Sequence, residues 1–254
     1  MTTVPIDFGL DGKAVVVAGA SRGIGARLAV GCAEAGAESV ALLGRSVDEL
    51  GLVAEEVTAA GAEATVLRCD VTSVTSIEAA FNGVERVDVL VHNAGANRPE
   101  PFVEVSADTF DRLLALNVRG AFFTVQAATR MMVAARQGGA IIIISSQMGH
   151  VGAPNRAVYC TTKHAIEGLT KALAVELAVD GIRVVSVSPT FVRTEMTAAQ
   201  LDDPELGPDL LAQIPQGRFG TVDDVAGAVV YAASPAASLL TGTSIVVDGG
   251  WTAR

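Results

Sequence analysis

Two residues four positions apart, Tyr159 and Lys163, carry the clearest chemical pattern in the sequence. They lie in the helix-like segment NRAVYCTTKHAIEGL, so both side chains project from one helical face. A tyrosine with its ordinary pKa of about 10 transfers protons poorly near neutral pH, and a neighbouring ammonium favours the phenolate. We therefore expect Lys163 to lower the pKa of Tyr159 and to make it a general acid and base.

A serine precedes this pair in the sequence. Ser146 directly follows an apolar run and precedes Tyr159 by thirteen residues. Its hydroxyl can donate a hydrogen bond to an oxygen atom that gains negative charge, while Tyr159 supplies a proton. The alternative is that both residues only pack or cap helices.

A glycine-rich segment from Gly19 to Gly25 follows another apolar run and opens the helix-like segment ARLAVGCAEAG. Glycines permit a tight turn and a close approach of the backbone to a ligand. A helix N-terminus presents free N–H groups and the positive end of its dipole. This setting predicts a binding site for the pyrophosphate of a dinucleotide.

The second apolar run ends in LGRS (43–46), where NAD-binding proteins place a carboxylate on the ribose hydroxyls. Arg45, together with Arg22 of the glycine segment, instead offers guanidinium groups that suit a 2′-phosphate. We therefore expect NADP(H) as the cofactor, with NAD(H) less favoured. The alternative is that both arginines are solvated surface residues.

Apolar, β-branched runs separated by helix-like segments form the scaffold for these residues. The runs show little alternation of polar and apolar residues, which is typical of parallel strands covered on both sides. Right-handed crossovers then give an α/β fold, a doubly wound seven-stranded parallel sheet with helices on both faces, whose ligand site lies beyond the carboxyl ends of the strands. We expect strands at residues 14–18, 39–43, 64–68, 87–91, 140–145, 182–188 and 244–248.

Capping patterns mark several helix ends. Ser46 with Glu49 predicts a capping box ahead of a helix that stops at Gly61. Thr221 with Asp224 predicts a second capping box.

The irregular stretch over residues 194–217 carries three prolines and five acidic residues. A structureless loop of this length is unusual, so we expect helical pieces that form a movable flap over the substrate. The alternative is a surface excursion without function.

The chain has 254 residues with 18 basic and 28 acidic side chains, so its formal charge is −10. This length fits a single domain, residues 1–254. A surface this acidic repels phosphate backbones and anionic headgroups.

The sequence starts without a basic and apolar leader and has no apolar run that spans a bilayer. We expect a cytoplasmic protein with a small-molecule substrate, and neither nucleic acid nor a membrane as partner.

Cys32, Cys69 and Cys160 lie far apart and show no CxxC spacing, so they indicate neither a disulfide framework nor a metal site. We interpret them as small buried hydrophobes and expect no metal. The alternative is a cysteine nucleophile, Cys160, with His164 as its base.

Taken together, these motifs resemble the short-chain dehydrogenase/reductase family over essentially the whole chain. The glycine segment has the spacing GxxxGxG, and HNAG (92–95) is similar to the family's NNAG. Asn117 in LNVRG matches the family's helix asparagine, while Ser146, Tyr159 and Lys163 match its serine and its YxxxK pair. The chain is similar to the bacterial branch that contains gluconate and polyol dehydrogenases and 3-oxoacyl reductases. This resemblance implies a Rossmann fold.

Three positions depart from the family pattern. Ala18 replaces a threonine that often precedes the first glycine, so we expect no hydroxyl that ties the glycine segment to the turn after the fourth strand. His92 replaces the first Asn of NNAG, and we interpret it as a packed residue, with a hydrogen bond to the neighbouring loop as the alternative. Thr190 replaces the glycine of the family's NPG and narrows the backbone freedom beside the nicotinamide.

The resemblance also assigns roles. It implies that Lys163 binds the nicotinamide ribose, that Asn117 orders a water of a proton relay, that Asp70 contacts the adenine, and that Val192 and Thr194 meet the carboxamide. The implied catalytic residues are Asn117, Ser146, Tyr159 and Lys163. The cofactor residues are Gly19, Ser21, Arg22, Gly23, Ile24, Gly25, Arg45, Ser46, Asp70, Val71, Asn93, Ala94, Gly95, Tyr159, Lys163, Val192 and Thr194. We expect a substrate pocket lined by Asn97, Arg98, Gln147, Met148, His150, Val151, Asn155, Arg156, Thr190 and Phe191.

Two functions from different classes are consistent with these patterns. The first is an NADP(H)-dependent alcohol dehydrogenase or ketoreductase for a small polar hydroxy or oxo compound of the polyol, sugar-acid or 3-oxoacyl type. The alternative is a non-catalytic dinucleotide-binding protein that acts as a redox sensor or assembly partner. The intact Ser146, Tyr159 and Lys163 favour the enzyme, because a sensor has no physical need for a proton-transfer pair.

The mean hydropathy of +0.43 is high for a soluble chain. Long helices expected over residues 106–136 and 155–179 carry apolar residues on several faces, which indicates burial between subunits. We expect a homo-oligomer, and the family resemblance implies a homotetramer.

Overall fold

A computed structural model describes residues 6–253 and contains one sheet of seven parallel strands. The strands lie in the order β3-β2-β1-β4-β5-β6-β7, which confirms the predicted doubly wound sheet. Each expected strand is present, and its ends differ from the prediction by at most two residues, because backbone pairing rather than side-chain type defines them. The strands are β1 (Ala14–Ala18), β2 (Ser39–Gly44), β3 (Glu63–Arg68), β4 (Val89–His92), β5 (Gly139–Ile144), β6 (Ile182–Pro189) and β7 (Ser244–Val247).

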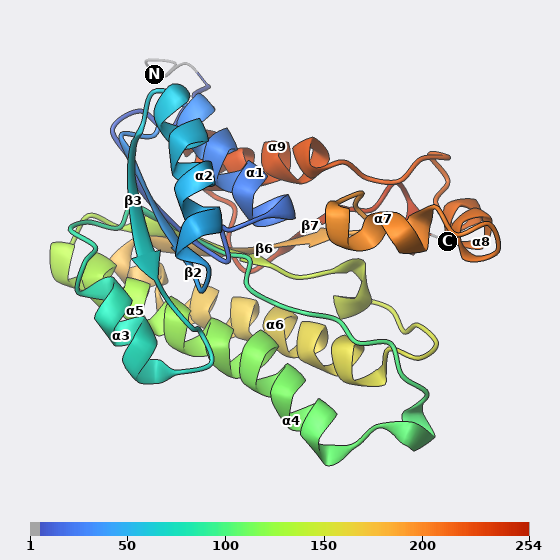
Figure 1. Ribbon diagram of the computed structural model, residues 1–254. Helices are drawn as coiled ribbons and strands as arrows, with labels where there is room; N and C mark the ends of the chain where they lie inside the picture. Colours follow the sequence, from blue (N-terminus) through green and yellow to red (C-terminus); the bar gives the residue numbers. More distant parts are fainter. Residues whose placement is uncertain (1–5, 254) are drawn as a thin grey trace.

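Helices cover both faces of the sheet (Figure 1). One face carries α1 (Gly23–Glu34), α2 (Val47–Ala59) and α9 (Val222–Ala233). The other carries α3 (Val74–Phe81), α5 (Gly120–Ala135) and α6 (Ala157–Glu176). In β1, Val15 and Val17 join the first core, whereas Val16 and Ala18 join the second. Because successive strand side chains point to opposite faces, a strand covered on both sides is apolar at every position.

The two predicted capping boxes differ. The Thr221 hydroxyl accepts a hydrogen bond from the backbone of Asp224, whose carboxylate accepts one in return, so this box is confirmed. Ser46 accepts a bond from the backbone N of Glu49 at 3.4 Å, but no reciprocal bond forms among the described residues. The predicted box at α2 is therefore only half formed. Gly61, with a φ of 101°, lies just beyond the end of this helix, as expected.

The single helix expected over residues 106–136 is interrupted. Helix α4 (Ala107–Leu114) runs into a π-helical turn, η2 (Ala115–Arg119), and continues as α5. Turns of this kind are rare and are frequent at functional sites. The turn contains the buried residue Asn117. The helix expected over 155–179 is α6, followed by the short turn η4 (Ala178–Asp180).

The stretch over residues 194–217 contains two short helices, as predicted, α7 (Glu195–Leu201) and α8 (Leu206–Ala212). They lie beyond the ends of β6 and β7 at one side of the molecule (Figure 1). Within residues 6–253, none of the helices combines the length and apolar character that crossing a bilayer requires. The remaining 3-10 turns are η1 (Phe102–Glu104), η3 (Gln147–Gly149), η5 (Pro235–Ala237) and η6 (Trp251–Ala253).

Candidate active site

The loops after β1 and β4 meet where the strand order reverses. The backbone N of Asn93 donates to the Ala18 carbonyl at 2.9 Å, and its side-chain amide donates to the Gly19 carbonyl at 2.9 Å. A Cβ at Gly19 would lie 2.7 Å from the backbone N of Ala94, so only glycine fits this approach. As expected, Ala18 offers no hydroxyl for a tie between the glycine segment and the β4 turn, and the Asn93 amide supplies this bond instead.

The start of α1 fits an anionic ligand. No side chain caps its first turn, which contains no acidic residue, whereas Ser46 and Thr221 cap α2 and α9 with their hydroxyls. The N–H groups at this helix end are therefore available to a pyrophosphate. A Cβ at Gly25 would lie 1.9 Å from the Gly19 carbonyl oxygen, so the segment packs tightly only as glycine. The donor set and the close backbone packing fit a dinucleotide.

A cavity of about 270 Å³ opens beside this helix end. It brings together most of the residues that the sequence predicted for catalysis and for binding the cofactor and substrate near the reacting atoms. Those that line it are Arg22, Gly23, Ile24, Asn93, Gly95, Asn97, Ser146, Gln147, Met148, Tyr159, Lys163, Thr190, Phe191, Val192 and Thr194.

Helix α7 adds cavity residues that sequence reasoning did not name. Glu195, Met196, Thr197 and Gln200 line the cavity from the expected flap. Thr194 begins α7 through a capping box with Thr197. This spacing of two threonines was the available signal for a helix start here, but it does not show which helical face meets the cavity.

Tyr159 faces Ser146 and Lys163, which with Asn117 form what we call the catalytic cluster. Burial raises the pKa of Tyr159 to about 12, and hydrogen bonding to Ser146 offsets part of that effect. The Lys163 ammonium lies 5.6 Å from the centre of the Tyr159 ring and donates to the Ile144 carbonyl at 2.9 Å. The expected lowering of the Tyr159 pKa by Lys163 is therefore wrong for the protein alone, because desolvation of the phenolate dominates.

Lys163 is itself buried, and burial lowers its pKa to about 8, although the charge of Glu167 acts in the opposite direction. His92 lies near this ammonium. Burial and the charge of Lys163 together lower the pKa of His92 to about 3, so its ring is neutral at physiological pH. Neither ring nitrogen of His92 has a partner within ordinary hydrogen-bond limits among the described residues. The Ala94 backbone, in the loop after β4, nevertheless acts as a hydrogen-bond partner that raises the pKa of the ring, so the alternative of a contact with this loop stays a prediction.

Asn117 is fixed by the backbone of the β4 loop. Its Oδ1 accepts from the Ala96 N at 2.9 Å, and its Nδ2 donates to the Ala96 carbonyl at 2.8 Å and to the Thr162 hydroxyl at 3.1 Å. A Cβ at Gly95 would approach the Asn117 Oδ1 to 3.3 Å. The π-helical turn therefore holds Asn117 against the loop that lines the cavity.

Arg22 and Arg45, which we call the phosphate edge, are both exposed. Neither forms an ion pair within residues 6–253. The pKa of Asp70 is lowered mainly by hydrogen bonds from Thr72 and further by the charge of Arg45. Several expected cofactor residues lie outside the cavity lining, on the glycine segment, the β4 loop and the ends of β2 and β3, namely Gly19, Ser21, Gly25, Ala94, Arg45, Ser46, Asp70 and Val71.

Five expected pocket residues do not line the cavity. His150 instead directs its Nε2 to the Ser188 and Ser244 hydroxyls, at 3.2 Å each. Asn155 is exposed and has a left-handed φ of 59°. Arg98, Val151 and Arg156 are also absent from the lining. These five residues lie outside this cavity, because proximity in sequence to a cavity residue does not fix the direction of a loop side chain.

The cysteines show no nucleophile geometry. Cys32 and Cys69 are buried, and burial raises the pKa of Cys32 to about 12 and that of Cys69 to about 11. Cys160 is half-buried. The His164 ring contacts the backbone carbonyl of Cys160 at 2.9 Å, which gives no support to a cysteine nucleophile activated by His164.

Comparison with known proteins agrees with this geometry. The family model described as enoyl-(acyl carrier protein) reductase matches residues 19–252. D-threitol dehydrogenase of Mycolicibacterium smegmatis is 38% identical, over 99% of this chain and 97% of that protein. The 3-oxoacyl-[acyl-carrier-protein] reductase of Staphylococcus aureus is also 38% identical, over 94% of this chain and 97% of that protein.

A solved structure extends the likeness to three dimensions. The gluconate 5-dehydrogenase of Burkholderia cenocepacia, in complex with NADP and tartrate, is 34% identical and superimposes with a TM-score of 0.93. The match covers 98% of each chain. Fold, motifs and near-complete alignment together show that this chain belongs to the short-chain dehydrogenase/reductase family of oxidoreductases.

Proposed function

We propose that this oxidoreductase transfers a hydride between NADP(H) and a small polar hydroxy or oxo compound of the polyol, sugar-acid or 3-oxoacyl type. The observation that carries the proposal is the convergence of Ser146, Tyr159 and Lys163 on one cavity that also receives the uncapped start of α1. A dinucleotide bound there supplies the hydride. A non-catalytic sensor, the alternative function, does not require this proton-transfer arrangement.

Ser146 and Tyr159 have complementary tasks at a substrate oxygen. The Ser146 Oγ accepts a hydrogen bond from the Met148 backbone N at 3.2 Å, so its own O–H remains free to donate. Because the pKa of Tyr159 is about 12, the phenol holds its proton at neutral pH and donates it to a carbonyl oxygen. The Lys163 ammonium then stabilises the phenolate that remains. These properties favour the reductive direction.

The choice of NADP(H) rests on the phosphate edge. Arg22 and Arg45 are exposed in the loops that follow β1 and β2, and the segment LGRS at the end of β2 offers no carboxylate to repel a 2′-phosphate. The NADP bound to the gluconate 5-dehydrogenase described above supports the same choice.

The substrate class follows from unpartnered polar atoms in the cavity. The Gln147 Oε1 and the Thr190 Oγ1 are buried there without a hydrogen-bond partner among the described residues. Buried polar groups of this kind cost free energy unless a ligand or water bonds them, so a substrate with several hydroxyl groups suits this cavity. The threitol and gluconate substrates in the relatives' names agree with a polyol or sugar acid.

The test is a paired activity panel. NADPH oxidation is measured with carbonyl compounds of the three types, and NADP⁺ reduction is measured with the matching polyols and sugar acids. We expect turnover with at least one polyhydroxylated pair. Tight NADPH binding without turnover across the whole panel would support the sensor instead.

We also propose a homotetramer. Phe110 and Phe122 of α4 and α5 are 40% and 44% exposed, and Val175 and Val179 near the end of α6 are 82% and 89% exposed. Large apolar side chains on these helices provide surface that a second subunit can bury. Light scattering at micromolar concentration is expected to give an oligomer mass, and a monomer mass would contradict this proposal.

A further inference from the structure

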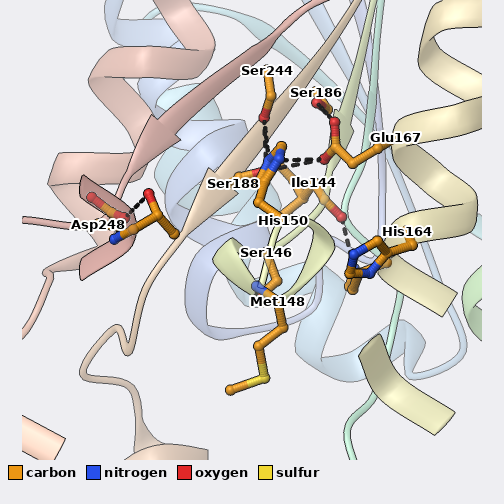
Figure 2. Close-up of polar contacts among 12 residues, drawn as sticks. Ile144, Ser146, Met148, His150, His164, Glu167, Ser186, Ser188, Ser244 and Asp248 are labelled. Atoms are coloured by element: carbon orange, nitrogen blue, oxygen red, sulfur yellow. Dashed lines mark hydrogen bonds and ion pairs between the residues drawn. The ribbon is translucent and has the colours of Figure 1, made fainter. Parts of the chain in front are cut away.

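A buried polar cluster that the mechanism above does not use surrounds Glu167 (Figure 2). At its centre is Glu167 of α6, which is only 6% exposed. Its Oε2 accepts a hydrogen bond from the Ser186 hydroxyl at 2.8 Å, and its Oε1 accepts one from the Ser188 hydroxyl at 3.1 Å. The His150 Nε2 lies 3.6 Å from Oε1, and it also contacts the hydroxyls of Ser188 and Ser244.

The Glu167 carboxylate and the Lys163 ammonium belong to the same helix and bond to adjacent strands. Glu167 follows Lys163 by one helical turn, so both side chains leave the same face of α6. The Lys163 Nζ bonds to the Ile144 carbonyl of β5, and Ile144 is paired with Val187 of β6. Ser186 and Ser188, the residues on either side of Val187, bind Glu167. The ammonium is thus bonded to the last residue of β5, and the carboxylate is bonded to the two β6 residues that flank its pairing partner.

Turn η3 packs tightly against the part of α6 that carries Lys163 and Glu167. A Cβ at Gly149 would lie 3.1 Å from both the Glu167 Cγ and the Lys163 carbonyl. Glycine therefore lets η3 pack directly against this part of α6. Burying an ammonium without a compensating charge costs free energy. A carboxylate one helical turn away therefore favours the charged form of Lys163.

We infer that Glu167 is a positioning residue whose buried carboxylate keeps Lys163 in the ammonium form and holds that charge beside Tyr159. The inference rests on the proposed function for its catalytic meaning. Ser186, Ser188 and His150 hold the carboxylate in place, because each offers it a donor or a polar contact.

The titratable groups around the pair can be named. Glu167 on its own helix acts on Lys163, and the Tyr159 ring centre lies 5.6 Å from the ammonium. The Lys163 charge in turn acts on His92 at the end of β4. His150, from the segment after β5, faces Glu167, while β6 and β7 contribute serine hydroxyls. Since burial keeps His92 neutral, Glu167 is the anion that opposes the desolvation of Lys163.

The experiment uses the fact that the chain has only three lysines, Lys13, Lys163 and Lys171. In protein labelled with ¹³C at lysine Cε, each ammonium titration is followed by NMR without ligand. In Glu167→Gln, which keeps the side-chain shape and removes the charge, the Lys163 midpoint is expected to fall by about one pH unit or more. Lys13 and Lys171 serve as internal controls and are expected not to move.

The pH dependence of the kinetics is expected to shift in the same direction as the Lys163 midpoint. The alkaline limb of kcat/KM for NADPH is expected to move to lower pH in Glu167→Gln by the same amount as the Lys163 midpoint. His150→Gln is the matched control, because it keeps a hydrogen-bond donor near Oε1 and leaves the carboxylate in place. Its Lys163 midpoint is expected to equal that of the parent.

An unchanged Lys163 midpoint in Glu167→Gln would overturn the inference. If that variant does not fold, Glu167→Met replaces the carboxylate with an apolar side chain of similar length and is judged by the same criterion. The NMR titration needs no turnover. A parent enzyme that is inactive on every substrate therefore contradicts the proposed function alone, whereas turnover with an unmoved midpoint contradicts only the role of Glu167.

Discussion

The catalytic cluster and the phosphate edge differ in how far the protein fixes them before a ligand binds. In the cluster, Asn117 and Lys163 are buried and bonded to backbone carbonyls. At the phosphate edge, Arg22 and Arg45 are exposed and form no ion pairs within residues 6–253. The fold itself supplies hydrogen-bond partners to these two buried groups, whereas the exposed arginines are hydrated until a ligand binds. Changes in the cluster should therefore affect the reaction, and changes at the edge should affect the choice of cofactor.

The largest effect is expected from Tyr159→Phe, which removes the transferred proton and little volume. The value of kcat should fall by roughly 10²–10⁴-fold, while NADPH affinity stays close to that of the parent. Steady-state kinetics and fluorescence titration of NADPH measure the two quantities. Activity above about a tenth of the parent value would show that Tyr159 is not the general acid.

At the phosphate edge, Arg45→Ala should lower kcat/KM for NADPH by about one to two decades and leave NADH nearly unaffected, because a charge-assisted bond to Arg is worth roughly 1.5–3 kcal/mol. Gly44→Asp combined with Arg45→Ala should go further, since the new carboxylate repels the phosphate and can hold the ribose hydroxyls of NAD. Equal losses with both cofactors, or a parent that already prefers NADH, would mean that Arg45 does not recognise the phosphate.

The pH dependence of the parent enzyme tests the charge of Lys163 in the catalytic cluster. Because burial lowers the pKa of Lys163 to about 8, the ammonium is present below this pH and is lost as the pH rises through it. The Tyr159 phenol, with a pKa of about 12, stays protonated over the same range. We expect kcat/KM for NADPH to fall about tenfold per pH unit above the Lys163 pKa, as measured in initial-rate assays. A flat profile to pH 10, roughly two pH units above that value, would contradict a role for the Lys163 charge.

The smallest expected effect concerns the flap, residues 194–217, which joins neither region. Helix α7 lines the cavity through Met196 and Gln200, but Met196 is 71% exposed. We expect amide hydrogen exchange in this segment to be faster than in β5 and to slow when NADPH and substrate bind together. Exchange that is already slow without ligand and unchanged with it would rule out closure of the flap.

Much of the fold was predictable because its signals are local. Continuous apolar runs identified the strands, and the Thr221 capping pattern identified the start of α9. The π-helical turn at Asn117 was not predicted, since a single widened turn leaves the apolar pattern of a long helix nearly unchanged. The reciprocal bond expected at Ser46 also failed to form among the described residues, because the sequence pattern of a capping box does not fix the rotamer of its Glu side chain.

The sequence by itself determined the order of strands and helices, the glycine segment, and the spacing of Ser146, Tyr159 and Lys163, because each depends on residues close together in the chain. Only the tertiary structure decided which side chains reach the cavity. It placed His150 beside Glu167 rather than in the cavity. It also set the protonation of Tyr159, since a pKa depends on desolvation and on charges from distant segments, and neither is encoded in local spacing.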